Sequence, residues 1–220
     1  MANAPLRPAL LGPPIIRALS AIDPSRVPTA APELPSALSQ WVDWNRAVSL
    51  AAALDVRPPA DRATDVPWQV RADALRSDHA TTRQQLQASA ESAVEALGQA
   101  PLAPAELLRS VQTVQRAAQA ASGRLRGIAR ETVAARDEDG ARLAAIDAVM
   151  EQTLAPREAR LLENAVSRAL AQWTGGDAAA EGWPEGLPNP LQHTLLTLLQ
   201  ADLTLRFHPV EGLLDALRTH

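Results

Sequence analysis

Apolar residues recur along the middle of the chain at the spacing of long helices that pack on a neighbour. Between residues 104 and 136 they follow steps of four and three, and between 67 and 98 the steps are nearly the same. The first row is Leu107, Val111, Val114, Ala118, Ala121, Leu125, Ile128 and Thr132, and the second is Trp68, Ala72, Leu75, His79, Thr82, Leu86, Ala90, Val94 and Leu97. We call these rows the heptad seams; they predict helices over 68–98 and 104–136. Because the connection between them is short, the two helices are expected to form an antiparallel hairpin.

Helices are also predicted on either side of this hairpin. Residues 36–54 carry apolar side chains over most of a helical circumference, which is typical of a helix that is buried or contacts a partner. The segment 137–140 is expected to be a turn, and the helix after it to kink or restart at Pro156. Asn189-Pro190 is a helix start signal that His208-Pro209 repeats, so two C-terminal helices are expected within 189–217.

The prolines divide the chain into one folded part and several connections. Proline-rich segments predict a disordered tail over 1–14, a linker over 23–35 and a loop over 56–67, with two helical turns between Ile15 and Ile22. Residues 15–220 are therefore predicted to form a single helical domain. With 3% aromatic residues the chain is a poor candidate for a β-sandwich. The expected fold is all-α, an elongated helical bundle of five or six helices with a long central coiled-coil-like hairpin at 68–136.

Composition excludes several kinds of chemistry. The chain has no Cys, so it has no thiol nucleophile, disulfide or Cys-ligated metal. All 21 basic residues are Arg, so a P-loop of ordinary type and Schiff-base chemistry are also excluded. The four His lack the spacing of a helical zinc site, and no nucleophile motif is present. No catalytic, metal or cofactor-binding residue and no cofactor are predicted, and the chain is expected not to be an enzyme. An enzyme using His79 or His208 with a carboxylate is the least favoured hypothesis.

Charge and hydropathy indicate the compartment and exclude some partners. A net charge of −4 gives no general attraction to nucleic acid. No stretch reaches the roughly 18 apolar residues of a membrane span, and the proline-rich N-terminus does not read as a signal peptide. A cytoplasmic protein without a direct membrane span is therefore expected.

Two groups of residues are candidates for partner contacts. Arg116, Arg126 and Arg130 belong, with Arg124, to a local basic cluster, which is a solvated helix face or a contact for an acidic partner. Trp41 and Trp44 are expected mainly in the core, with partner anchoring as the alternative, because Trp is enriched in interface hot spots. Trp183 lies in a predicted loop and either folds back onto the bundle or faces a partner.

Three segments resemble a known family. They are 35–44 (PSALSQWVDW) with 47–50 (AVSL), 142–154 (RLAAIDAVMEQTL) with 157–158, and 203–214 (LTLRFHPVEGLL). Together they resemble a family of uncharacterised proteobacterial proteins of the Burkholderia and Xanthomonas type, catalogued as a domain of unknown function. The resemblance spans about 15–217 and carries no catalytic residues. It implies a cytoplasmic accessory of a bacterial envelope complex, encoded beside components that resemble ion-driven motors and peptidoglycan-binding proteins.

These observations favour a non-enzymatic interaction or scaffold protein. Its partners are expected to be other proteins, envelope-complex components among them, or further copies of the chain, all contacted through helix faces. The alternative is a regulatory bundle that binds a small ligand in a pocket lined by Trp residues.

Overall fold

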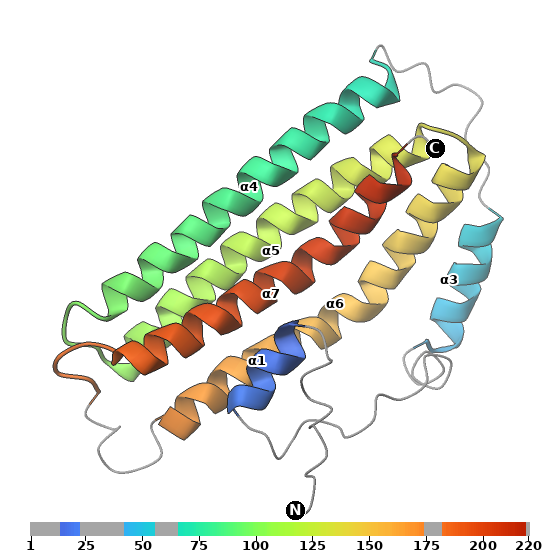
Figure 1. Ribbon diagram of the computed structural model, residues 1–220. Coiled ribbons are helices and arrows are strands. Elements are labelled where there is room, and N and C mark those ends of the chain that lie inside the picture. The colour runs from blue at the N-terminus through green and yellow to red at the C-terminus, as the bar shows by residue number, and fades with distance from the viewer. Residues whose placement is uncertain (1–13, 23–41, 56–65, 174–181, 219–220) are drawn as a thin grey trace, which may run out of the picture. The chain divides into compact units, whose positions relative to one another are not determined.

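A computed structural model of the protein describes residues 14–22, 42–55, 66–173 and 182–218; of these, the side chains of 19–22, 158 and 161–173 are not described. The described residues form six helices (Figure 1): α1 (Pro14–Ile22), α3 (Trp44–Leu54), α4 (Trp68–Leu97), α5 (Pro104–Ala134), α6 (Glu138–Trp173) and α7 (Asn189–Ala216). No strand occurs in this part of the chain, and the single β-bridge joins Leu102 and Trp183. The all-α class and the number of helices are confirmed.

The chain divides into two compact units whose segments alternate along the sequence. Unit 1 comprises residues 1–31, 86–116 and 162–205, and unit 2 comprises 32–85, 117–161 and 206–220. The helices α4, α5, α6 and α7 therefore each contribute residues to both units. The single helical domain over 15–220 stays a prediction.

Unit 1 has a leucine- and valine-rich core. Val94 and Leu97 of α4, Leu107 and Val111 of α5, and Leu195 of α7 are buried there together. Ile15 and Ala18 bring α1 into the same cluster. The predicted helix over 15–22 is confirmed, and it begins one residue earlier, at Pro14, a residue that suits the first helical position.

Unit 2 is built from α3 and from parts of the four long helices. Its fully buried large side chains are Leu125, Val133, Phe207, Val210 and Leu217. Phe207, the chain's one phenylalanine, packs against His79 with ring centroids 5.4 Å apart.

The heptad seams coincide with the buried faces of α4 and α5. Every seam residue of α4 is buried or half-buried, and in α5 only Ile128 is exposed. The residues Ala72, Leu75, Ala90, Val94, Leu107, Val111, Ala118, Leu125 and Thr132 are fully buried. The period therefore identified the correct helices and the correct faces.

The predicted helix over 36–54 is wrong at its start. Val42 and Asp43 are not helical, and α3 begins at Trp44. Asp43 caps the helix, because its carboxylate accepts a 2.8 Å hydrogen bond from the backbone N–H of Arg46. Residues 36–41 lie outside the described part. The expectation that Trp44 is mainly a core residue is also wrong, because its side chain is 82% exposed.

Three predicted breaks differ from the structure: one is shifted, and no helix restarts at the other two. The turn predicted over 137–140 lies at 135–137 instead, because α5 ends at Ala134 and α6 begins at Glu138. Asp137 caps α6 by accepting a 2.6 Å hydrogen bond from Gly140 N–H. The restart at Pro209 is wrong too, since α7 runs from Asn189 to Ala216 with Pro209 inside it. The helix α6 does not restart at Pro156 either, since it is one helix with Pro156 inside, and a kink there stays a prediction. The predicted tail over 1–14, linker over 23–35 and most of the loop over 56–67 lie outside the described residues, except that Pro14 is helical.

Candidate functional site

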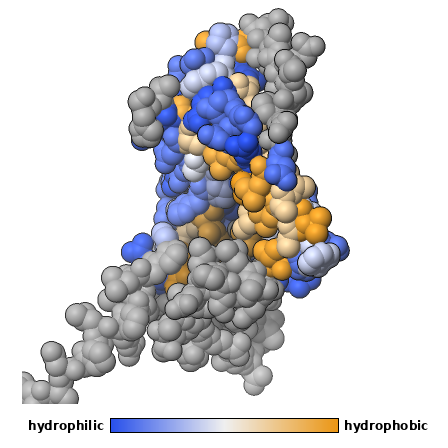
Figure 2. Space-filling view, turned by 90° about the vertical axis from the view of Figure 1, so that its right-hand side faces the viewer, coloured by the Kyte–Doolittle hydropathy of each residue, from blue (hydrophilic) through white to orange (hydrophobic). Residues whose placement is uncertain are grey.

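The helix α3 presents an apolar face to solvent. Its outward residues Trp44, Ala47, Val48, Ala51, Ala52 and Leu54 are all exposed. At 100° per residue they fall within an arc of about 160°. Figure 2, which faces the side on which α3 lies in Figure 1, shows apolar residues gathered in a continuous patch. We call these six residues the α3 apolar face.

A narrow set of contacts holds the other side of α3. Ala53 is 4% exposed and Leu50 is half-buried. Arg46 donates a 2.7 Å hydrogen bond to the side-chain oxygen of Gln152 on α6, within unit 2. The helix thus contacts the rest of unit 2 through a narrow face, while Trp44, Val48 and Leu54 point to solvent. A helix that buries alanine and exposes tryptophan has the reverse of the usual arrangement.

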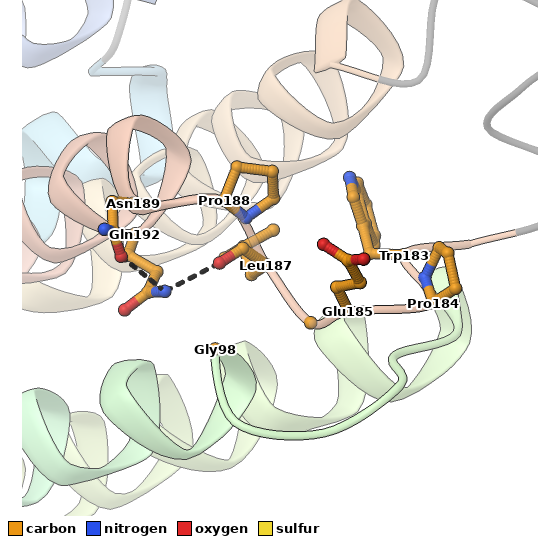
Figure 3. Close-up of a pocket in the computed structure, with 9 residues that line it drawn as sticks. Gly98, Trp183, Pro184, Glu185, Leu187, Pro188, Asn189 and Gln192 are labelled. Atoms are coloured by element: carbon orange, nitrogen blue, oxygen red, sulfur yellow. Dashed lines mark hydrogen bonds between the residues drawn. The ribbon is translucent and has the colours of Figure 1, made fainter.

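Trp183 lies in a second, separate place, on the turn before α7 in unit 1. Its backbone N–H and C=O exchange two 2.8 Å hydrogen bonds with Leu102, and its half-buried side chain packs against the core of unit 1. It also lines a pocket of about 420 Å³, shown in Figure 3, with Gly98, Pro184, Glu185, Gly186, Leu187, Pro188, Asn189 and Gln192. Of the two expected roles for Trp183, the structure therefore shows that it folds back.

The three candidate arginines do not form one basic surface. Arg126 donates to the carboxylate of Asp147 on α6 through Nη2 at 2.7 Å and Nε at 2.8 Å. Arg130 pairs with the same carboxylate at 3.3 Å and with Glu151. Arg116 is exposed and donates to the backbone carbonyl of Gln112, in its own helix. Arg126 and Arg130 are thus neutralised by Asp147 and Glu151, a partnership between helices that periodicity could not reveal. Trp41 lies outside the described residues.

His79 is one of the two histidines considered for an enzyme, and it is nearly buried in unit 2. Its side chain is 14% exposed, with Nε2 3.9 Å from a carboxylate oxygen of Glu211, and Glu211 pairs with Arg83. Burial lowers the pKa of His79 and outweighs the opposite effect of the Glu211 charge. Among the described residues Nε2 has no hydrogen-bond partner. His208, the other histidine of that hypothesis, is exposed on α7.

The described residues contain neither a metal-binding cluster nor a membrane-spanning helix. Where the structure describes the chain, no group of three or more His, Asp or Glu side chains is placed to hold a metal ion. None of the described helices combines the length and the apolar character that crossing a membrane requires.

Over the residues that the structure describes, the protein is all-α, and α3 presents an apolar face to solvent. The chain belongs to the family described as "Protein of unknown function (DUF3348)", whose family model matches residues 1–219. This confirms the resemblance to a domain of unknown function. Neither a curated protein nor a solved structure matches the chain.

Sequence reasoning did not single out Glu185 or Gln192 at the Trp183 pocket. The signal that could have found them is the Gly182-Trp183-Pro184-Glu185-Gly186 segment, which places an aromatic ring and a carboxylate two residues apart between two glycines.

Proposed function

We propose that this protein is a non-enzymatic interaction protein that inserts α3 into an apolar groove of a partner protein. The observation that carries the proposal is the α3 apolar face, and above all the 82% exposure of Trp44. Large apolar patches on soluble proteins are typical of interaction sites. Trp44 and Val48 are four residues apart and Ala51 follows three later, which is the anchor spacing of a helix bound in a groove.

The dimensions of α3 favour a groove over a second copy of the same helix. An 11-residue helix is about 16 Å long and about 10 Å wide. Two such faces laid flat on each other cover far less than the roughly 800 Å² per partner of a standard interface. A groove contacts the flanks of the helix as well as its outer edge, so it buries more of the same residues.

Charge at the two ends of α3 indicates what surrounds the groove. Asp43 and Asp55 are both exposed, at the N-cap and the C-cap. Arg46, the one basic residue of this helix, is hydrogen-bonded to Gln152 within unit 2. The complementary partner therefore has basic side chains at both ends of its groove.

A photocrosslinking experiment tests the proposal in the native cells. p-Benzoylphenylalanine replaces Ala51 in the centre of the α3 apolar face, and the matched control places it at Ala74, an exposed alanine of α4. We expect a crosslinked partner from position 51 that is absent from position 74. The partner is then purified and its affinity measured with the full-length protein.

Two valines supply a matched pair for the affinity measurement. Val48 on α3 and Val70 on α4 are 51% and 57% exposed. Val48→Asp and Trp44→Ala should each weaken binding at least about tenfold, whereas Val70→Asp should leave it unchanged. Equal effects of Val48→Asp and Val70→Asp would contradict a site on α3. A crosslink from position 51 to a second copy of the chain would replace the proposal by self-association.

The family resemblance adds a location to this proposal. We take the partner to be a component of an envelope complex that the protein reaches from the cytoplasm. The crosslinked partner tests this directly, because an envelope component should be recovered only after the membrane fraction has been solubilised. A partner recovered from the soluble fraction would remove the envelope assignment and leave the α3 site in place.

A further inference from the structure

The pocket beside Trp183 is built by a tightly held turn of unit 1. Trp183 and Leu102 exchange two backbone hydrogen bonds, Gly186 N–H donates to the Trp183 carbonyl at 3.1 Å, and Leu187 N–H donates to the Leu97 carbonyl at 2.8 Å. Residues 183–187 are therefore fixed at two points, to Leu102 in the connection between α4 and α5 and to Leu97 at the end of α4, and the bond from Gly186 to Trp183 closes the turn. The backbone of this turn is therefore in place without a bound ligand.

Two glycines permit this close approach. Gly182 and Gly186 both have positive φ values, +79° and +85°, which other residues rarely adopt. A Cβ atom at Gly186 would lie only 2.6 Å from the carbonyl oxygen of Gly98. The glycines bring the turn onto the backbone of 98–102 and leave Trp183 and Glu185 on the same side of it.

The pocket has the chemistry of a site for a cation. Trp183 and Glu185 extend from the turn to the same side (Figure 3), and both line the pocket. Glu185 is the one charged side chain among the described lining residues. A tryptophan face attracts cations through its quadrupole, and a carboxylate adds a full opposite charge. An anionic ligand is disfavoured because no lining residue is basic.

The amide of Gln192, which also lines the pocket, is held in place by two hydrogen bonds. Its Nε2 donates at 2.6 Å to the carbonyl of Leu187 and at 3.3 Å to the side-chain oxygen of Asn189. Because the amide nitrogen is used in this way, the amide oxygen is left as the free end of the side chain. That oxygen points away from Trp183 and Glu185 (Figure 3), so the carboxylate of Glu185 is the acceptor beside the aromatic ring for a planar ligand with several N–H donors.

We propose that this pocket binds a small organic cation, with a guanidinium group stacked on Trp183 and paired with Glu185. Its volume of about 420 Å³ lies within the range of small-molecule sites. A guanidinium is planar and presents parallel N–H donors to a carboxylate, whereas a quaternary ammonium can use only the ring face. The proposal concerns a different unit from α3 and does not depend on the function proposed above.

The test uses the full chain labelled with 5-fluorotryptophan and observed by ¹⁹F NMR. The chain has five Trp, and Trp183→Phe assigns the signal of Trp183. Methylguanidinium chloride is titrated at constant ionic strength, with methylurea as the neutral probe of the same size. We expect a saturable shift of the Trp183 signal with a millimolar Kd, none with methylurea, and little change at the other tryptophans.

Substitutions locate the binding energy. Glu185→Gln removes the charge from an exposed residue and should weaken methylguanidinium binding by about tenfold. Glu91→Gln, at an exposed glutamate of α4 in the same unit, is the matched control and should bind like the wild type. Equal shifts with methylurea, or full binding by Glu185→Gln, would overturn the proposal. Equal binding of tetramethylammonium would retain a cation site and overturn the guanidinium preference.

Discussion

Gly140 occupies a position where a side chain cannot be accommodated. It lies in the first turn of α6, and a Cβ atom there would overlap the backbone carbonyl oxygen of Val133. Gly123, in the interior of α5, has nothing within 4 Å of its Cβ position. We therefore expect Gly140→Ala to lower the free energy of unfolding by more than about 1 kcal/mol, and Gly123→Ala to raise it by about 0.5–1 kcal/mol. Urea unfolding followed by circular dichroism measures both.

The two glycine variants act as controls for each other, because the chemical change is the same. Stabilisation by Gly140→Ala would show that α6 can begin without the close contact to Val133. The sequence alone marks Gly123 as a weak point of the helix, since glycine has a low helix propensity. It does not distinguish Gly140, because the contact that requires glycine comes from a residue seven positions away.

His79 should make folding stability depend on pH. Burial places its pKa in the folded state below its ordinary value of 6.5, so the unfolded chain binds a proton first as the pH falls. Stability is therefore complete above about pH 7 and decreases as the pH falls through 6.5 toward the lower folded-state pKa. His79→Gln should show a flatter dependence of the unfolding midpoint between pH 7 and about pH 5.5.

The control for this prediction is His193→Gln, at an exposed histidine of α7. It should retain the wild-type pH dependence. An unchanged slope in His79→Gln would assign the effect to other groups, and Glu211 and Arg83, the charged residues beside His79, are the first to test. The seam position of His79 was visible in the sequence, but its neighbours were not, because Phe207 and Glu211 lie on a helix more than a hundred residues later.

A cluster of four charged side chains joins α5 to α6. Arg126 and Arg130 share the carboxylates of Asp147 and Glu151, and all four side chains are less than a third exposed. Removing Arg126 leaves two carboxylates to share Arg130 alone, so one negative charge of this partly buried cluster is no longer balanced. We expect Arg126→Met to lower the free energy of unfolding by about 2 kcal/mol. A double-mutant cycle with Asp147→Asn should give a coupling energy above about 1 kcal/mol.

The pair Arg142–Glu138 is the comparison for this cycle. It lies within α6 at i,i+4 spacing, and its side chains are 39% and 52% exposed. Its coupling energy should be about 0.3–0.5 kcal/mol. Similar coupling in the two cycles would show that the contact between the helices is no stronger than a surface pair.

The helices themselves could be predicted far better than their ends and their polar contacts. The heptad period identifies α4 and α5 because it records burial directly. Capping by Asp43 and Asp137 overrides the apolar pattern at α3 and the turn-like composition before α6. At Pro209 the sequence pattern indicated a start, but the ring costs one hydrogen bond of α7, and Val210, Leu213 and Leu214, all buried, keep the helix continuous. The burial of these side chains depends on other helices, so a local sequence pattern cannot indicate it.

The sites could be predicted only in part for the same reason. Tryptophan content made Trp44 and Trp183 candidates, yet their opposite placements, one exposed and one folded back, depend on what each helix or turn contacts. The partners of Arg126 and Arg130 and the convergence of Trp183 with Glu185 also come from the folded chain. Residue types indicated which side chains matter, and the tertiary structure decided how each is used.

The alternation of the two units along the sequence predicts how the protein unfolds. Because α4, α5, α6 and α7 each supply residues to both units, neither unit can lose its helices without interrupting helices of the other. Leu195 is buried in unit 1 and Leu125 in unit 2. Replacing either by Ala should remove about 2–5 kcal/mol and reduce the protection of the slowest-exchanging amides equally in residues 104–116 and 117–134 of α5, as hydrogen exchange measures. A loss of amide protection confined to the half of α5 in the substituted unit would contradict this prediction. The two units would then unfold independently, although they share helices.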